Sequence, residues 1–531
     1  MYRWPIALGA VLLLALALRL HGIHDPILDH PAWRQGDTAA IARNFARLRF
    51  DVMYPQTLYN GPPPNYVELE LQIVPFLAAS LYKIFGVHEI FGRILTVAFS
   101  LATVVTLAYF ARWLFRSDVA GVVAAFFYAV FPGSVYYGRT FMPDCAMVFF
   151  LTAALYAVTR YLAEDEAFPL RGPTASTALL TLAYLAKPVA TFAVVPLLGL
   201  LAERKRAARP MRPLFAAVLL ALPLLVLALY DRRLDSHAEW HWASGITRLH
   251  VLPALRDALT TAQGFKAKAG QLHVVLGLFR DTLMGNIAFA LTIACFVALP
   301  WVPSRSRTLL WAWLAGGLAY VYVVVTVERV DYYMYPLLPL CALVIGGAAA
   351  RFVTYVRTAD IAPIARYALL ALVPIVAVAT LLRSRTPIAP YYDYNKDVYR
   401  NAVDLDRTLP KDALIVIGHY GPDVQYYIDR FGWEEDPALW TPFDEESAIR
   451  KGARYFISIE DGRLRHNLEL CAWLQRFPVR DAAAAWPVYE TDPVKVSAQA
   501  ERFWRGFRNA ERAGTGRAFL DAAGVCRATN A

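Results

Sequence analysis

The sequence predicts a mainly α-helical protein that crosses a membrane many times and carries a small α/β domain near its C-terminal end. Of its 531 residues, 57% are hydrophobic and only 18% are charged, and apolar runs of 18 or more residues recur up to about residue 384. Soluble domains have about 45–50% apolar and about 25% charged residues. A run of about 18 apolar residues can cross roughly 30 Å of hydrocarbon. We therefore expect a transmembrane module at 1–384 and an α/β domain at 385–531.

The formal net charge is +10, yet the distribution of the basic residues argues against nucleic acid as a partner. Lysine and arginine occur in short clusters between the hydrophobic runs. Cytoplasmic loops of membrane proteins carry such an excess of basic residues, whereas a nucleic-acid-binding face gathers them on one surface. Membrane lipids are therefore the expected surroundings of the chain.

The first apolar run begins after Arg3 and ends near Leu20, and no small-x-small cleavage site follows it. We interpret it as a retained transmembrane helix with a cytoplasmic N-terminus. A long outer loop at about 21–93 should follow. Within this loop, the segment 69–86 is expected to lie along the outer surface, because a full crossing would move the next basic turns outside.

The same charge bias gives a count of about eleven crossings, with everything after Arg383 outside. The expected crossings are at about 4–20, 94–111, 119–136, 145–162, two short ones within 177–202, 213–230, 283–303, 307–327, 332–350 and 364–382.

The apolar stretch 177–202 is too long for one crossing and is interrupted by Lys187-Pro188. Proline disfavours helical backbone at the residue before it. Two short helices with Lys187 at an outer turn would keep the following basic cluster in the cytoplasm. That cluster consists of Arg204, Lys205, Arg206, Arg209 and Arg212.

After residue 385 the pattern changes to that of a small external α/β domain. The segments 411–420 and 452–461 are typical of short β-strands, and 486–490 is a candidate third strand. The sequence between them has a helical pattern. Cys471 and Cys526 both lie in this part and could form a disulfide if it lies outside the cytoplasm.

Under this topology several polar residues lie on the outer side, and each has a purely structural alternative. Asp37 and Asp144 could be helix caps, Glu70 a solvated residue, and Arg139 and Lys187 side chains that extend to lipid headgroups. The tyrosines could be interfacial anchors. The candidate site residues are Asp37, Glu70, Arg139, Asp144, Lys187, Arg329, Tyr332 and Tyr333.

Taken together, these residues suit a substrate that carries phosphate and a lipid. A carboxylate can act as the general base on an acceptor hydroxyl. Asp37 and Asp144 could instead hold a divalent ion such as Mg²⁺, Mn²⁺ or Zn²⁺. Arginine binds phosphate through two hydrogen bonds and lysine as a point charge.

The order of these features resembles the GT-C superfamily of polytopic glycosyltransferases, in the branch of the aminoarabinose transferases and protein O-mannosyltransferases. The resemblance covers about 1–350. It rests on the acidic first outer loop, LYKIFG, GRILTVAF, an RWLFR turn, YYGRTFMPD, the Lys-Pro break and YYMYPLLP. Where aminoarabinose transferases carry Lys-Pro at the start of the surface segment, this chain has Glu70-Leu71. The resemblance therefore implies a reaction class and not that particular sugar.

The resemblance implies transfer of a sugar from a polyprenyl-phosphate carrier, with inversion, on the periplasmic face of a bacterial inner membrane. Asp37 and Asp144 match the family's acidic positions, and Arg139 and Lys187 would hold the carrier phosphate. Glu70, Arg329, Tyr332 and Tyr333 are expected to contact substrate. The acceptor could be a lipid, a glycan or a protein. Two alternatives are a transporter or flippase and a non-enzymatic component of polysaccharide assembly.

Overall fold

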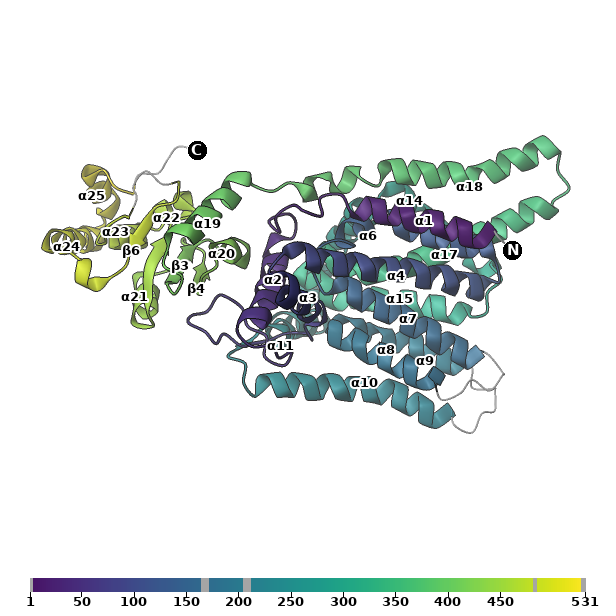
Figure 1. The fold of residues 1–531 in the computed structure, drawn as a ribbon. Helices are drawn as coiled ribbons and strands as arrows, with labels where there is room; N and C mark the ends of the chain where they lie inside the picture. Colours follow the sequence, from purple (N-terminus) through teal and green to yellow (C-terminus); the bar gives the residue numbers. More distant parts are fainter. Residues whose placement is uncertain (1–2, 164–170, 204–211, 481–484, 527–531) are drawn as a thin grey trace. The chain divides into compact units, whose positions relative to one another are not determined.

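The computed structural model describes residues 3–163, 171–203, 212–480 and 485–526, and most of them are helical (Figure 1). The chain forms two compact units. The first unit comprises residues 1–25, 51–53 and 68–392. The second comprises residues 26–50, 54–67 and 393–531, so it contains most of the first loop in addition to the C-terminal part.

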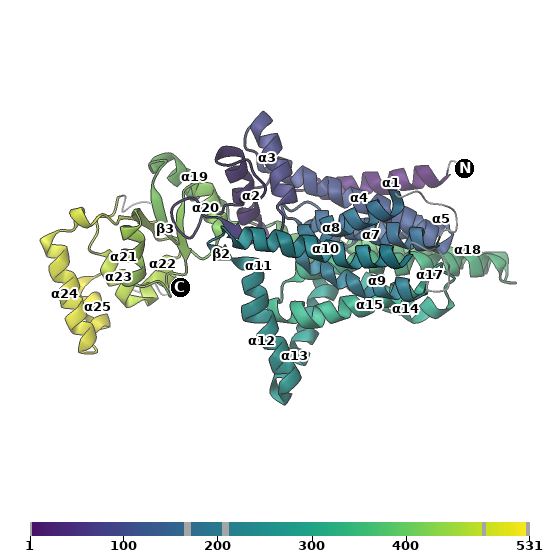
Figure 2. The ribbon, with the colours of Figure 1, turned by 90° about the horizontal axis from the view of Figure 1, so that it is seen from below.

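The regular structure in the described part of the first unit is almost entirely helical, apart from a short strand, β2 (Trp240–His241), and Glu68 of a second short strand. Its α-helices are α1 (Arg3–Arg19), α3 (Ile73–Phe85), α4 (Glu89–Phe115), α5 (Asp118–Val130), α6 (Pro132–Tyr137), α7 (Asp144–Ala163), α8 (Arg171–Ala186), α9 (Val194–Glu203), α10 (Arg212–Asp235), α11 (Trp242–Gly245), α12 (Leu252–Thr260), α13 (Ala262–Leu278), α14 (Asn286–Ala298), α15 (Arg307–Tyr320), α16 (Thr326–Glu328), α17 (Leu338–Thr358) and α18 (Pro363–Arg383). Helices α12 and α13 pack against each other and extend away from the bundle (Figure 2).

Among the described residues, six helices are long and apolar enough to cross a membrane, or seven if one bent pair is a single span. Four shorter apolar helices accompany them, at Trp4–Arg19, Ile73–Phe85, Asp118–Val130 and Pro188–Glu203. A polytopic helical fold is thus confirmed, whereas the expected count of about eleven crossings is not. Only 6% of the apolar stretch within the helical segment Pro363–Tyr392 is buried in the protein, as expected for a helix whose surface faces lipid.

Small residues bring α5 and α17 into close contact at the centre of the bundle. A Cβ on Gly346 of α17 would lie 2.5 Å from the carbonyl oxygen of Ala120 and 2.9 Å from the Cβ of Ala124. Membrane helices associate through such small residues because burial from lipid supplies little hydrophobic driving force. Glycine at 346 therefore lets the two backbones approach each other.

The break predicted at Lys187-Pro188 is present. Helix α8 ends at Ala186, Lys187 has extended backbone (φ −164°), and a 3₁₀ segment at Pro188–Ala193 leads into α9. The cause is the one expected from the sequence, because proline removes a backbone donor and disfavours helix before it. Of the basic cluster, residues 204–206 and 209 lie outside the described residues, and Arg212 is the first residue of α10.

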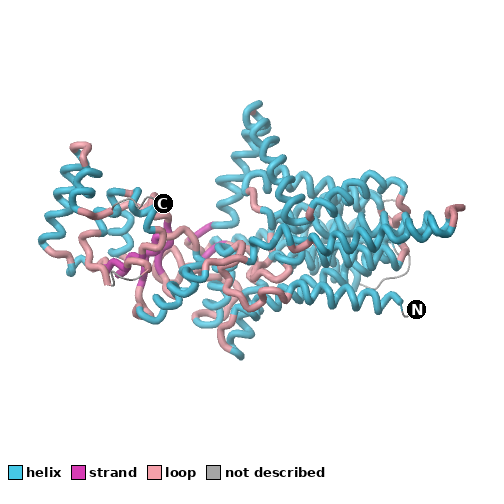
Figure 3. Tube along the Cα trace, turned by 90° about the horizontal axis from the view of Figure 1, so that it is seen from above, coloured by secondary structure: helices cyan, strands magenta, loops and turns pink. Residues whose placement is uncertain are grey.

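Strands are confined mainly to the second unit (Figure 3). Its elements are α2 (Ala32–Arg47), α19 (Lys396–Thr408), β3 (Leu414–Gly418), α20 (Pro422–Ile428), β4 (Gly432–Glu435), α21 (Pro442–Arg450), β5 (Ala453–Ile457), α22 (Asp461–His466), α23 (Leu468–Leu474), β6 (Val488–Glu490), α24 (Ala498–Arg512) and α25 (Gly516–Ala523). A further short strand, β1 (Val67–Glu68), lies within the first loop, and its first residue is the last residue of the segment 54–67 of this unit.

The four strands β3–β6 form one sheet in the order β4-β3-β5-β6. β3 pairs in parallel with both β4 and β5, and β6 runs antiparallel to β5. The three strands expected from the sequence are confirmed as β3, β5 and β6. The strand β4 was not expected, because it is only four residues long and follows directly on a helical pattern.

Helix α2, which carries Asp37, packs against α20 within the second unit. A Cβ on Gly36 would lie 2.5 Å from the Cα of Asp423, so only glycine allows this approach. Arg43 pairs with Asp429 at 3.0 Å and donates a hydrogen bond to the carbonyl oxygen of Tyr426 at 2.9 Å. The position of Asp37 therefore depends on the fold of the C-terminal part of the chain.

A disulfide joins Cys471 and Cys526. It links α23 to the residues that follow α25, across a sequence separation of 55 residues. Such a cross-link restricts the unfolded chain and so stabilises the folded form.

We predict that replacing both cysteines by alanine lowers the stability of the second unit by about 4 kcal/mol, the loop-entropy value for a cross-link of this span. Differential scanning fluorimetry of the full-length protein measures the change. Alkylation under denaturing conditions provides the control, because Cys145, Cys295 and Cys341 are free. Three thiols should react before reduction and five after it, and five before reduction would contradict the bond.

Candidate active site

Asp37 lies inside α2 with 1% of its surface exposed. Its carboxylate contacts the guanidinium of Arg34 at 3.2 Å and accepts a hydrogen bond from the hydroxyl of Tyr59 at 3.2 Å. The N-cap of α2 is Pro31, so the helix-cap interpretation of Asp37 is wrong. Burial, followed by the charge of Asp37, raises the pKa of Tyr59 and keeps its hydroxyl a hydrogen-bond donor.

Glu434 is a second acidic group near Asp37 that the sequence did not identify. It lies on β4, and the backbone N–H of Gly421 donates a hydrogen bond to its carboxylate. Burial is the main reason that the pKa of Glu434 is raised to about 8, and the negative charges of Glu435 and Asp37 add to the shift. At neutral pH Glu434 is therefore mostly protonated. No sequence signal pointed to it, because the strand that carries it was not predicted.

In the first unit, Asp144 and Lys187 form a buried ion pair with a distance of 2.7 Å between the ammonium and Oδ1. Asp144 is the first residue of α7, and Lys187 occupies the break after α8. The ammonium of Lys187 also lies 4.8 Å and 4.7 Å from the ring centres of Tyr332 and Tyr333. Four of the candidate residues thus come together, and Lys187 is buried instead of extending to headgroups.

Asp331, which was not among the candidate site residues, is the centre of a hydrogen-bond network. Its carboxylate accepts hydrogen bonds from the hydroxyls of Tyr137 at 2.7 Å, Tyr391 at 2.6 Å and Thr282 at 3.3 Å. The backbone N–H of Tyr332 donates a further bond at 2.7 Å. Through Tyr332 this network adjoins the Asp144–Lys187 pair, and it fixes the position of the aromatic ring beside the lysine.

The remaining candidates are placed differently. Arg139 is buried, donates to the carbonyl oxygen of Gly22 at 2.9 Å and lies over the ring of Tyr392 at 4.4 Å. Glu70 is buried, so the interpretation of it as a solvated residue is wrong. Arg329 is exposed at the end of α16. No contact among the described residues joins it to the Asp144–Lys187 pair.

One group of described residues has a geometry suited to a metal ion. One ligand atom each from Glu68, Asp235 and His241 lies within 4.8 Å of the others, and the Asp235 and His241 side chains are 3.0 Å apart. Burial raises the pKa of Glu68, and a hydrogen bond from the backbone N–H of Ser244 opposes this shift. Neither Asp37 nor Asp144 belongs to this group.

Comparisons with known proteins agree on the fold. The model of the dolichyl-phosphate-mannose-protein mannosyltransferase family matches residues 72–230. The chain is similar in structure to ArnT from Cupriavidus metallidurans bound to undecaprenyl phosphate, with TM-score 0.53, 13% identity, and 93% of this chain and 99% of ArnT covered. Apo ArnT gives TM-score 0.53, 14% identity and the same coverage.

The chain is also similar to the arabinofuranosyltransferase AftD from Mycobacteria. The TM-score is 0.50 at 14% identity, and the match covers 87% of this chain and 38% of AftD. No curated protein matches in sequence. At these identities the likeness is one of fold.

We predict that Lys187→Met destabilises the protein by about 3–5 kcal/mol, because it leaves the carboxylate of Asp144 buried without its partner. The double variant Asp144→Asn/Lys187→Met carries no unpaired charge and should regain most of the thermal stability. The exposed Lys266→Met is the matched control. Equal melting temperatures for the single and double variants would contradict this account of the pair.

We further predict a pH-dependent effect of Glu434→Gln. The folded-state pKa of Glu434, about 8, is above the ordinary value of 4.5. Its contribution to stability is therefore present below pH 4.5 and is lost as the pH rises through about 8. The variant should melt like the wild type at pH 5 and several degrees higher at pH 9. The exposed Glu469→Gln is the control, and parallel curves for wild type and Glu434→Gln would refute the prediction.

Proposed function

We propose that this chain is a polytopic glycosyltransferase of the GT-C superfamily, and that it transfers a sugar from a polyprenyl-phosphate carrier to an acceptor in the cell envelope. The observation that carries the proposal is the structural match to ArnT over nearly the whole of both chains. The ligand of that ArnT structure, undecaprenyl phosphate, supports the choice of carrier.

In the proposed reaction Asp37 is the general base. It takes the proton of the acceptor hydroxyl while the acceptor oxygen bonds to the anomeric carbon. The bond from that carbon to the phosphate oxygen breaks, and the polyprenyl phosphate leaves with the bonding electrons. Attack opposite the leaving group inverts the anomeric centre. Arg34 and Tyr59 hold the carboxylate of Asp37 in one orientation.

Lys187 and Arg139 are the proposed partners of the carrier phosphate. Both are cations held on the first unit by described contacts, Lys187 by Asp144 and Arg139 by the carbonyl oxygen of Gly22. A cation with a fixed position stabilises the charge that develops on a leaving phosphate without reorganising first. Tyr332 and Tyr333 line the same lysine and would contact the sugar or the phosphate.

The proposed location is a bacterial inner membrane, with the catalytic residues and the C-terminal part on the periplasmic side. The disulfide between Cys471 and Cys526 supports an oxidising compartment for the second unit.

A metal requirement stays a prediction. The expected ligands were Asp37 and Asp144, whereas the described group with three suitable side chains is Glu68, Asp235 and His241. Carboxylate oxygen and imidazole nitrogen are ligands that suit zinc or manganese.

We expect purified protein to transfer labelled sugar from a synthetic polyprenyl-phosphate donor, with Asp37→Asn at least about 100-fold slower, the usual loss for a general base. Asp144→Asn should also be slow, because it releases Lys187 from its fixed position. Transfer is measured as radiolabel in an extracted envelope acceptor fraction. Asp412→Asn, at an exposed carboxylate of the second unit, is the control.

Full transfer activity in both variants would show that Asp37 and Asp144 are not part of the active site. Absence of transfer by the wild type, together with movement of the intact donor across a vesicle membrane, would show a flippase instead.

A further inference from the structure

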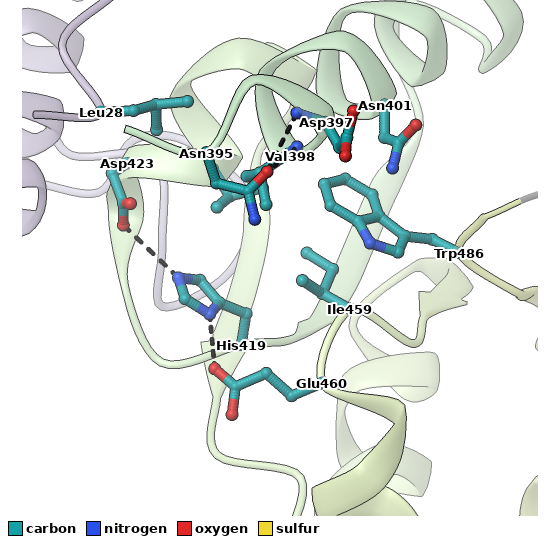
Figure 4. A pocket seen from close by; sticks show the side chains of 11 residues that line it. Leu28, Asn395, Asp397, Val398, Asn401, His419, Asp423, Ile459, Glu460 and Trp486 are labelled. Atoms are coloured by element: carbon teal, nitrogen blue, oxygen red, sulfur yellow. Dashed lines mark hydrogen bonds and ion pairs between the residues drawn. The ribbon is translucent and has the colours of Figure 1, made fainter. Parts of the chain in front are cut away.

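The second unit contains a pocket of about 480 Å³, which is within the size range of small-molecule sites (Figure 4). Its polar lining comes from Asn395, Asp397, Asn401, His419, Asp423 and Glu460. These side chains come from α19 and its N-cap, from the ends of β3 and β5, and from α20. Leu28 of the first loop also lines the pocket.

The pocket lies where an open α/β sheet usually binds a ligand. From β3 the chain passes through α20 to β4 on one side, and then through α21 to β5 on the other side of β3. The strand order therefore reverses between β3 and β5, and ligands of such sheets bind outside the carboxyl ends of the strands at this switch point. His419 directly follows β3, and Glu460 lies three residues beyond the end of β5.

His419 positions two carboxylates in the pocket. Its Nδ1 lies 2.6 Å from Glu460, and its Nε2 lies 3.5 Å from Asp423 (Figure 4). Burial alone would lower the pKa of His419, but these two carboxylates outweigh burial and raise the pKa to about 9. Because both ring nitrogens are occupied, the imidazolium acts as a positioning group and is not free to accept a proton.

The charge of the lining excludes an anionic ligand. Three carboxylates face one imidazolium, and the described residues of the lining include no lysine or arginine. Arg400 and Arg463 pair with Asp397 and Glu460 from outside the lining, the second pair at 3.3 Å. Phosphate and carboxylate ligands need a cation that faces them. Hydroxyl groups, in contrast, donate to carboxylates and accept from amides.

The rest of the lining suits a polyhydroxylated ring. Oδ1 of Asn395 accepts from the backbone N–H groups of Asp397 and Val398, which leaves its amide donors for a ligand. Asn401 lies one helical turn after Asp397, on the same face of α19. Trp486 and Ile459 provide an apolar wall (Figure 4). Carboxylates, amides and an aromatic face together provide hydrogen bonds to sugar hydroxyls and contact for the C–H face of the ring.

We propose that this pocket binds an uncharged sugar residue of a saccharide acceptor. Its role as an acceptor site rests on the proposed function. The pocket adjoins the helix of the proposed base, because Asp423 of its lining packs directly against Gly36, the residue before Asp37. The acceptor is then a glycan or a glycolipid headgroup, and not an unmodified protein.

The test uses labelled full-length protein in lipid nanodiscs, without any polyprenyl-phosphate donor. The protein is applied to an array of defined neutral, amine-bearing and anionic oligosaccharides, and the best neutral compound is then titrated in solution. We expect binding to neutral saccharides and a loss of affinity of at least about 10-fold in Asn401→Ala and in Glu460→Gln. The exposed Asn509→Ala and Glu469→Gln are the matched controls.

Asp37→Asn should bind saccharide like the wild type, which separates this proposal from the proposed transfer reaction. Melting temperatures of all variants show whether they fold. Three results would overturn the proposal: no binding across the array, a preference for anionic saccharides, or unchanged affinity in both pocket variants. Saccharide binding by a wild-type protein that shows no transfer activity would overturn the proposed function and leave the pocket as a saccharide site.

Discussion

The buried pair of Asp144 and Lys187 is the interaction on which the arrangement of the first unit most depends. A charge inside a helical bundle is costly unless an opposite charge accompanies it. The pair joins the start of α7 to the break after α8, and the rings of Tyr332 and Tyr333 lie beside the lysine. The Asp331 network then fixes the chain segment that carries those rings.

The second unit uses buried charge in a different way. Asp37 has a cation and a hydroxyl within hydrogen-bond distance. Among the described residues no such cation pairs with Glu434, which is mostly protonated near neutral pH. Two neighbouring carboxyl groups with different environments can be charged and neutral at the same pH. This is the electrostatic condition that a general base needs beside a second acid.

The sequence allowed prediction of features that local chemistry determines. Proline after Lys187 predicted the helix break, and short segments with β-branched and aromatic residues predicted β3, β5 and β6. Contacts between distant segments left no local pattern, so the partners of Asp331 at positions 137, 282 and 391 were not predicted. The strand β4 was missed because it is short and contains two glutamates, and with it the environment of Asp37 and the switch point were missed.

Helix α2 belongs to the same compact unit as the C-terminal sheet, although about 370 residues separate the end of α2 from β3 in the chain. The proposed base, Asp37, is therefore held in place by the C-terminal α/β region, which the sequence alone suggests is a separate domain. Truncating the chain after the last apolar helix would remove the support of α2 along with the sheet. The C-terminal region is thus not a module that can be exchanged or deleted independently of the first loop.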